Sequence, residues 1–99
     1  MYPFNPRQME LMASAKSAGI PIVAFVTSFD NLTTKTRLLL EYDCYIVWSE
    51  NMRRELHALY PQSRARPVIV TGPPQFDILR NESLYQTRAD FLGGYGLDP

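Results

Sequence analysis

Hydrophobic residues along this chain follow two different spacings, and their alternation predicts the order of the elements. Three short runs rich in β-branched and aromatic residues, Ile20–Val26, Cys44–Trp48 and Pro67–Val70, are typical of strands buried in a sheet. Around these runs, hydrophobic residues recur three or four positions apart, as they do on the buried side of a helix. The pattern predicts an α/β fold, three-layered and Rossmann-like, with a small parallel sheet of about three strands flanked by helices.

Capping residues predict where the first two helices begin and end. Asn5, followed by proline, is a favourable start for the first helix, and Gly19 suits the position just after its end. A second helix is predicted over Leu32–Leu40, with Asp30 or Asn31 as its N-cap.

The same signals bound the two later helices. Ser49 is a suitable N-cap for a third helix, which Tyr60 should end because the residue before a proline disfavours the helical conformation. An amphipathic pattern predicts a last helix over Glu82–Leu92, which Gly93 and Gly94 should break.

The run Ile20–Val26 is the most hydrophobic of the three and suggests a central strand, yet the sequence offers little to lie on its outer side. Two interpretations follow. The chain is a piece of a larger α/β protein, or the exposed edge at Ile20–Val26 pairs with a second copy in a homo-oligomer.

Composition narrows the classes of function. The 99 residues allow one small domain, and the zero formal net charge gives no argument for a nucleic-acid partner. A single cysteine excludes an internal disulfide. Neither a signal peptide nor a membrane-spanning run is evident, so we expect a cytoplasmic protein, at most associated with the inner face of the membrane. No phosphate-binding or metal-binding motif occurs, and we expect neither a cofactor nor a metal.

Two polar segments follow predicted strands, where open α/β sheets bind their ligands. The segment Thr27–Asn31 either caps the following helix or forms a substrate loop. The segment Gly72–Asp77 is either a rigid connector or a ligand site, in which Gly72 would allow close approach to the backbone and Gln75 and Asp77 would contact the ligand.

Other residues that could take part in catalysis or binding have simpler interpretations. His57, the only histidine, falls on the polar side of its helix, where we expect a solvated residue rather than a catalytic base. Cys44 has no metal-ligand neighbours and is expected to be a buried structural residue. Four arginines near acidic residues indicate a mixed surface rather than a nucleic-acid site; they are Arg53, Arg54, Arg64 and Arg66.

Four segments in the same order resemble the bacterial glycosyltransferases of the two-Rossmann-domain (GT-B) type. They are Ala15–Pro21, Ser28–Lys35, Ile46–Met52 and Val70–Asp77. Within that type the chain is similar to a surface-carbohydrate group whose loop usually has Ser-Trp-Asp-Asn-Leu-Thr-Thr-Lys. This chain has Phe29 in place of the tryptophan and so retains an aromatic side chain.

The resemblance implies a division of the chain and a set of roles. Residues 1–80 would be an acceptor-side half-domain, and residues 81–99 a hinge helix leading to a C-terminal domain outside this sequence. Ser28, Asp30, Asn31 and Lys35 would line the acceptor side of the cleft, with Asp30 as a candidate catalytic base. Gly72–Asp77 would lie at the hinge, near the nucleotide sugar.

The resemblance also implies the partners. In a complete enzyme these would be a nucleotide sugar and a glycan or lipid-linked acceptor. Most donor contacts in the family come from the second domain, so this chain alone should be inactive and bind nucleotide sugars weakly or not at all. Two alternatives remain: a fragment similar to the sugar-nucleotide 2-epimerases, and a non-catalytic α/β interaction module.

Overall fold

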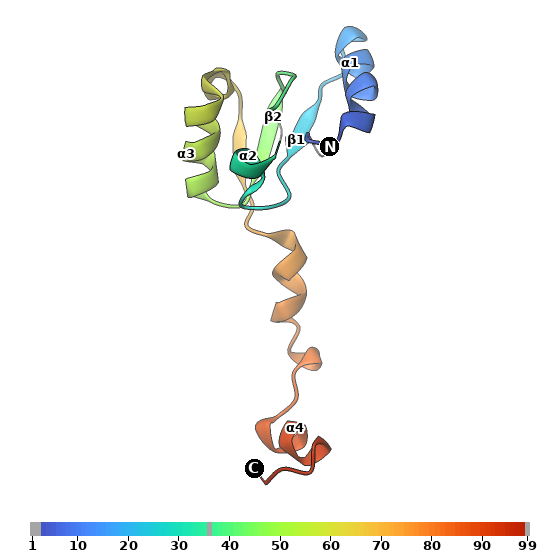
Figure 1. Cartoon of the computed structure of the whole chain (residues 1–99), viewed down its shortest axis with the longest axis vertical. Helices are drawn as coiled ribbons and strands as arrows, with labels where there is room; N and C mark the ends of the chain where they lie inside the picture. Colours follow the sequence, from blue (N-terminus) through green and yellow to red (C-terminus); the bar gives the residue numbers. More distant parts are fainter. Residues whose placement is uncertain (1–2, 36, 99) are drawn as a thin grey trace.

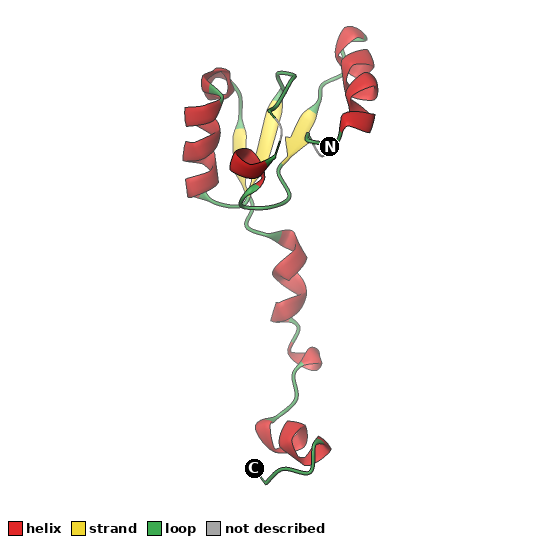
Figure 2. Ribbon diagram, in the orientation of Figure 1, coloured by secondary structure: helices red, strands yellow, loops and turns green. Residues whose placement is uncertain are grey.

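The sheet has three parallel strands in the order in which they occur along the chain. The computed structural model describes residues 3–35 and 37–98, and its strands are β1 (Val23–Phe25), β2 (Cys44–Val47) and β3 (Val68–Val70) (Figures 1 and 2). Both strand pairs are parallel, and Ile46 in β2 lies between Phe25 and Ile69. The predicted Rossmann-like α/β fold with a small parallel sheet is confirmed. The predicted third layer is not found among the described residues, because the described helices pack on one face of the sheet.

The central strand is β2 and not β1. The run Ile20–Val26 suggested a central strand, but only Val23–Phe25 is strand, and β1 stands at one end of the order. Val23 is 37% exposed. The reason is topological, because two successive right-handed crossovers in the same direction place the middle strand of the chain in the middle of the sheet.

Helices precede the sheet and connect its strands. They are η1 (Pro6–Gln8) and α1 (Met9–Ser17) before β1, α2 (Asn31–Thr34) after β1, and α3 (Glu50–Leu59) with η2 (Pro61–Ala65) after β2. Gly19 ends α1 as predicted, with a φ of 71° and its N–H bonded to Lys16. Ile20 completes the turn by donating to the carbonyl of Ala15, which is a Schellman motif.

The helix predicted over Leu32–Leu40 is much shorter in the structure. Its last helical residue is Thr34, and Lys35 is already extended; Thr36 lies outside the described residues. Tertiary contacts explain the difference, since Leu38 is buried and its N–H donates a hydrogen bond to the Tyr60 hydroxyl at 3.2 Å. An extended link allows that contact, whereas a helical turn would direct the same N–H to its own backbone.

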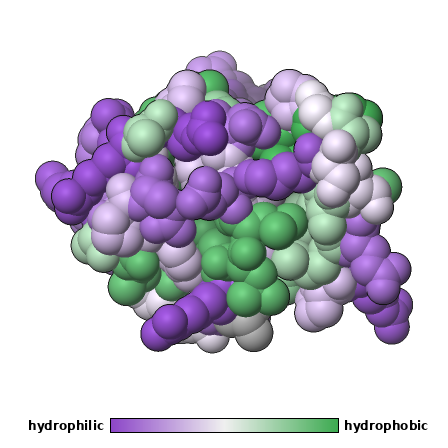
Figure 3. Space-filling view, turned by 90° about the horizontal axis from the view of Figure 1, so that it is seen from above, coloured by the Kyte–Doolittle hydropathy of each residue, from purple (hydrophilic) through white to green (hydrophobic). Residues whose placement is uncertain are grey.

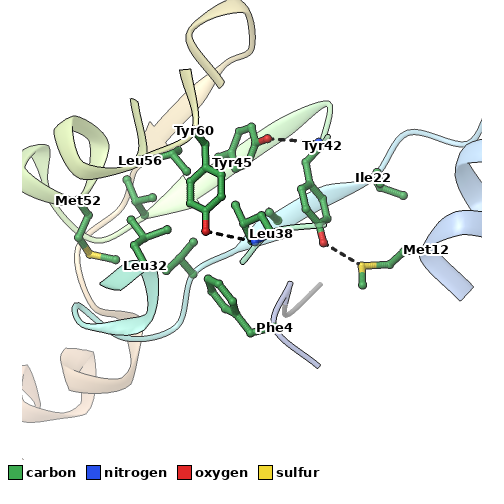
Figure 4. Packing of buried hydrophobic residues seen from close by; sticks show 13 residues of the cluster. Phe4, Met12, Ile22, Leu32, Leu38, Tyr42, Tyr45, Met52, Leu56 and Tyr60 are labelled. Carbon is green, nitrogen blue, oxygen red and sulfur yellow. Dashed lines mark hydrogen bonds between the residues drawn. The ribbon is translucent and has the colours of Figure 1, made fainter. Parts of the chain in front are cut away.

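The core lies between the sheet and the helices α2 and α3 (Figure 4). Tyr42 and Tyr45 are both at most 1% exposed and meet edge to face, with ring centroids 5.7 Å apart. From α3, Met52 and Leu56 enter the core, one helical turn apart. Helix α1 contributes Met12, whose sulfur accepts a hydrogen bond from the Tyr42 hydroxyl.

Beyond the sheet the chain forms an arm, residues 74–98, that extends away from the carboxyl ends of the strands (Figure 1). The arm contains η3 (Pro74–Arg80), η4 (Glu82–Leu84) and α4 (Arg88–Gly94), and none of these has a buried residue. The molecule measures 63 × 26 × 22 Å as a result. The single helix predicted over Glu82–Leu92 is therefore wrong, because extended residues from Tyr85 to Thr87 divide it.

Packing leaves hydrophobic surface exposed at both ends of the molecule. Seen from the end at which the strands begin, a hydrophobic area appears between hydrophilic residues (Figure 3). At this end Ile20 is 58% and Leu39 is 74% exposed. The small sheet thus buries only part of its apolar side chains.

Candidate functional site

The polar segments predicted from the sequence lie at the carboxyl edge of the sheet. Val26 continues β1 by bonding to Ile46, and Thr71 continues β3 by bonding to Val47, so the segments after these strands leave the same edge. Because β2 separates them, the two segments begin about 10 Å apart. That separation would suit a sugar-sized ligand across the end of β2.

In the first segment, Asp30 organises the start of α2. Its carboxylate accepts hydrogen bonds from the Ser28 hydroxyl at 2.6 Å and the Thr34 hydroxyl at 3.2 Å. The Ser28 bond is the largest influence on Asp30 and holds its pKa below the ordinary value of 3.8, with smaller support from Thr34 and the nearby charge of Lys35. Asp30 is therefore an ionised carboxylate, able to accept a hydrogen bond from a ligand hydroxyl and weak as a proton acceptor.

The two other predicted residues of this segment face different surroundings. Asn31 is only 3% exposed, and its amide lies 3.4 Å from the Thr27 hydroxyl. Its burial suits a residue that holds the loop in place. Lys35 is exposed and follows α2 at its C-terminal end. The structure thus joins Ser28 to Asp30 directly and Lys35 to Asp30 only through charge.

The second segment starts with a turn at Gly72. Its φ is 75°, and its N–H donates to the carbonyl of Trp48 at 3.0 Å. A Cβ added at Gly72 would meet no atom within 4 Å, so glycine is required here by the backbone conformation and not by crowding. The surface above Gly72 is open to a ligand.

The following residues belong to η3, in which Gln75 and Asp77 are exposed. Phe76 packs edge to face on Trp48, with ring centroids 6.2 Å apart, and thereby fixes η3 to the end of β2. In the described residues no hydrogen bond or ion pair joins this segment to the Ser28–Lys35 segment. The two groups share an edge but do not touch.

One hollow beside the sheet lies away from the site that the sequence indicated. A cavity of about 590 Å³ lies between α2, the link to β2 and the end of α3, and Lys35 is the only predicted site residue in its wall. Arg37, Leu38, Tyr60 and Gln62 also line it. Local sequence patterns do not indicate this hollow, because its walls come from segments more than twenty residues apart.

His57 is not the solvated residue that we expected. It is half-buried, and its Nδ1 lies 2.8 Å from the hydroxyl of Ser63, which is fully buried. A buried hydroxyl cannot reach a substrate, so this pair links α3 to η2 and serves the fold. Cys44, expected to be buried, is half-buried and carries a free thiol.

Within residues 3–35 and 37–98, no three or more His, Cys, Asp or Glu side chains are grouped so as to hold a metal ion. None of the described helices has the length and apolar character needed to cross a membrane. No family model, curated protein or solved structure matches the chain.

Proposed function

We propose that the chain is the acceptor-side half-domain of a GT-B-type glycosyltransferase, which moves a sugar from a nucleotide donor to a cell-envelope or glycan acceptor. The observation that carries the proposal is the pair Ser28–Asp30 at the carboxyl end of β1. An ionised carboxylate at that position can accept a hydrogen bond from an acceptor hydroxyl and orient it for attack. The resemblance of Ser28–Lys35 to the acceptor loop of that group supports the same role.

In this proposal the remaining residues bind and orient. Lys35 supplies positive charge at the end of α2. The buried Asn31 holds the loop in place through its contact with Thr27. Gly72 provides an open backbone turn at which the donor approaches, with Gln75 and Asp77 exposed on the following η3. The second domain of such an enzyme would supply most donor contacts, so the chain alone performs no transfer. The reaction would take place in the cytoplasm, or at the inner face of the membrane when the acceptor is lipid-linked.

The test is a set of NMR titrations of the isotope-labelled chain. Glycan acceptors and short-chain lipid-linked sugars form one panel, and uridine, guanosine and cytidine nucleotide sugars form the other. We expect acceptors to shift the amide signals of Ser28–Lys35, and nucleotide sugars to shift those of Gly72–Asp77 weakly. The variant Asp30→Ala should abolish the first effect, and Glu55→Ala on the solvent side of α3 should leave both unchanged.

Two outcomes would contradict the proposal. One is the absence of any acceptor-induced shift at Ser28–Lys35 across the whole panel. The other is a set of shifts confined to the cavity wall at Arg37, Tyr60 and Gln62, which would assign ligand binding to a different surface.

A second candidate function, a non-catalytic interaction module, is favoured by one specific observation. The sheet has an apolar face that no described helix covers, and apolar faces of that kind are typical of protein interaction sites.

A further inference from the structure

One face of the sheet lies outside the core. In parallel strands, residues paired by register point to the same side, so Val23, Phe25, Cys44, Ile46 and Ile69 share one face. None of the five belongs to the core cluster or to the side chains packed against it. Ile69 is 50% and Val23 is 37% exposed. Both crossover helices lie on the opposite face, as two successive right-handed crossovers require. We call these five residues the open face.

The arm is a second part of the molecule with exposed apolar side chains. Eight of its large hydrophobic side chains are more than half exposed; they are Phe76, Ile78, Leu79, Leu84, Tyr85, Phe91, Tyr95 and Leu97. Phe91 and Tyr95 lie one turn apart and contact one another with tilted rings, whose centroids are 5.1 Å apart, and α4 has no buried residue. A short helix with such side chains gains stability only when it packs on another surface.

The exposed area indicates how large that packing must be. The chain exposes 7157 Å². A compact monomer of its mass, 11.4 kDa, would expose about 5,800 Å². The chain thus exposes about 1,400 Å² more than a compact monomer. If both copies buried this excess area, the total would lie in the size range of permanent homodimer interfaces.

From these observations we infer that two copies of this chain associate by exchanging arms, so that the arm of each copy covers the open face of the other. The inference goes beyond the proposed function and does not depend on it. The exchange is reciprocal and closes on itself, which limits assembly to two copies. It also differs from strand pairing at the edge of β1, because it uses side chains on the face of the sheet.

The start of the arm explains why the partner is a second copy. The positive φ of Gly72, the two prolines that follow and the packing of Phe76 on Trp48 fix η3 at the carboxyl edge. From there the arm leads away from its own sheet (Figure 1). The arm of a second copy starts from that copy's own sheet. Its turn at Gly72 therefore does not keep it away from the open face of the first copy.

Charge favours the same pairing. The arm carries four carboxylates, Asp77, Glu82, Asp90 and Asp98, against two arginines, Arg80 and Arg88. Since the whole chain is neutral, the remainder carries the opposite excess of two positive charges. An acidic arm is thus attracted to the basic body of a second copy, most strongly at low salt.

The experiment measures mass against concentration for the 99-residue chain by sedimentation equilibrium. The mass should approach twice 11.4 kDa. Phe91→Glu in the arm and Ile69→Glu on the open face should each weaken association by about tenfold or more. The control is Leu11→Glu. Leu11 lies in α1, is 60% exposed and belongs to neither surface, so this variant should leave the association unchanged.

A mixture of the two variants separates arm exchange from other dimers. The Phe91→Glu chain retains its open face and the Ile69→Glu chain retains its arm, so together they form one intact contact and should associate more tightly than either alone. A dimer through the open faces alone would be insensitive to Phe91→Glu, and that result would overturn the inference.

Two further results would also overturn it. One is a mass of 11.4 kDa at every concentration up to the millimolar range. The other is a rate of Cys44 alkylation that does not fall as the wild-type concentration rises, because arm exchange covers the open face that includes Cys44. If Ile69→Glu failed to fold, Phe91→Glu would still test the inference. Phe91 lies in a helix with no buried residue, so its replacement should not affect folding.

Discussion

Ser28 donates a hydrogen bond of 2.6 Å to the carboxylate of Asp30, two residues further along the loop that follows β1. This bond is the main reason why the pKa of Asp30 lies below its ordinary value of 3.8. We predict that Ser28→Ala raises the pKa of Asp30, and that Thr34→Ala raises it less, because the Thr34 bond is longer and has a smaller influence. NMR titration of the side-chain carboxyl signal measures both effects.

The sign of the pH dependence follows from the same shift. A carboxylate with a lowered pKa stabilises the fold above its ordinary value of 3.8, and this contribution is lost as pH falls towards the pKa of the folded state. Ser14→Ala, an exposed serine of α1, is the control and should leave Asp30 unchanged. An Asp30 pKa that is unaffected by Ser28→Ala would show that this bond is not formed in solution.

Local sequence signals predicted the three strands and the caps at Gly19 and Ser49, but Gly93 and Gly94, which were predicted to break the last helix, lie within α4. Gly19 and Ser49 act within a few residues of their own positions, so their roles can be inferred without knowing the fold. The length of α2 could not be inferred in this way, since it depends on the Tyr60 hydroxyl twenty-two residues beyond Leu38. The central position assigned to the Ile20–Val26 run was wrong because strand order is set by both crossovers together.

The candidate site was predictable as two loops but not as a surface. Asp30 and Gly72 were found because polar or glycine residues follow hydrophobic strands. The packing of Phe76 on Trp48 depends on segments that are distant in sequence, and periodicity carries no information about it. The same holds for the open face, which becomes visible only once the register of all three strands is known.

Gly72 should be intolerant of any side chain because of its backbone conformation. Its φ of 75° lies in the left-handed region, where other residues cost about 1–2 kcal/mol. We predict that Gly72→Ala lowers the free energy of unfolding by about that amount, measured by urea denaturation, although a Cβ would meet no atom within 4 Å. The matched control is Gly94→Ala in α4, where φ is not positive and space is equally open, and no loss is expected there. Equal stability of the two variants would contradict this account.

Ser49 caps α3 with a side-chain oxygen that accepts a hydrogen bond from the Met52 N–H at 3.2 Å. Because α3 packs Met52 and Leu56 into the core, loss of the cap should weaken the whole fold. We predict that Ser49→Ala costs about 1 kcal/mol of unfolding free energy, measured by urea denaturation followed by circular dichroism.

A second cap in the same chain provides the comparison. Thr87 caps α4 in the same way, with its hydroxyl accepting from the Asp90 N–H at 3.1 Å, but α4 has no buried residue. Thr87→Ala should therefore leave the unfolding of the sheet unchanged in dilute solution. If both variants lost the same stability, the arm would be coupled to the core within one chain, contrary to the structure.

Tyr42 should make the fold sensitive to alkaline pH. Burial, together with the neighbouring Tyr45, raises the pKa of Tyr42 from 10.0 to about 12. Among the described residues, its hydroxyl is bonded only to the sulfur of Met12, a weak acceptor that cannot stabilise a phenolate. A group with a raised pKa in the folded state stabilises the fold fully below pH 10.0, and this contribution is lost as pH rises from 10.0 towards 12.

We therefore predict that the free energy of unfolding of the wild type falls over that range by up to about 2 kcal/mol. Tyr42→Phe removes the ionisable hydroxyl at the cost of one weak bond, so it should flatten this part of the pH profile while it lowers stability only slightly at neutral pH. Tyr95→Phe, whose ring is 70% exposed, should keep the wild-type profile. Urea denaturation at a series of alkaline pH values measures all three chains. If Tyr42→Phe lost stability as steeply as the wild type between pH 10 and pH 12, a group other than Tyr42 would cause the pH dependence. That result would contradict the prediction.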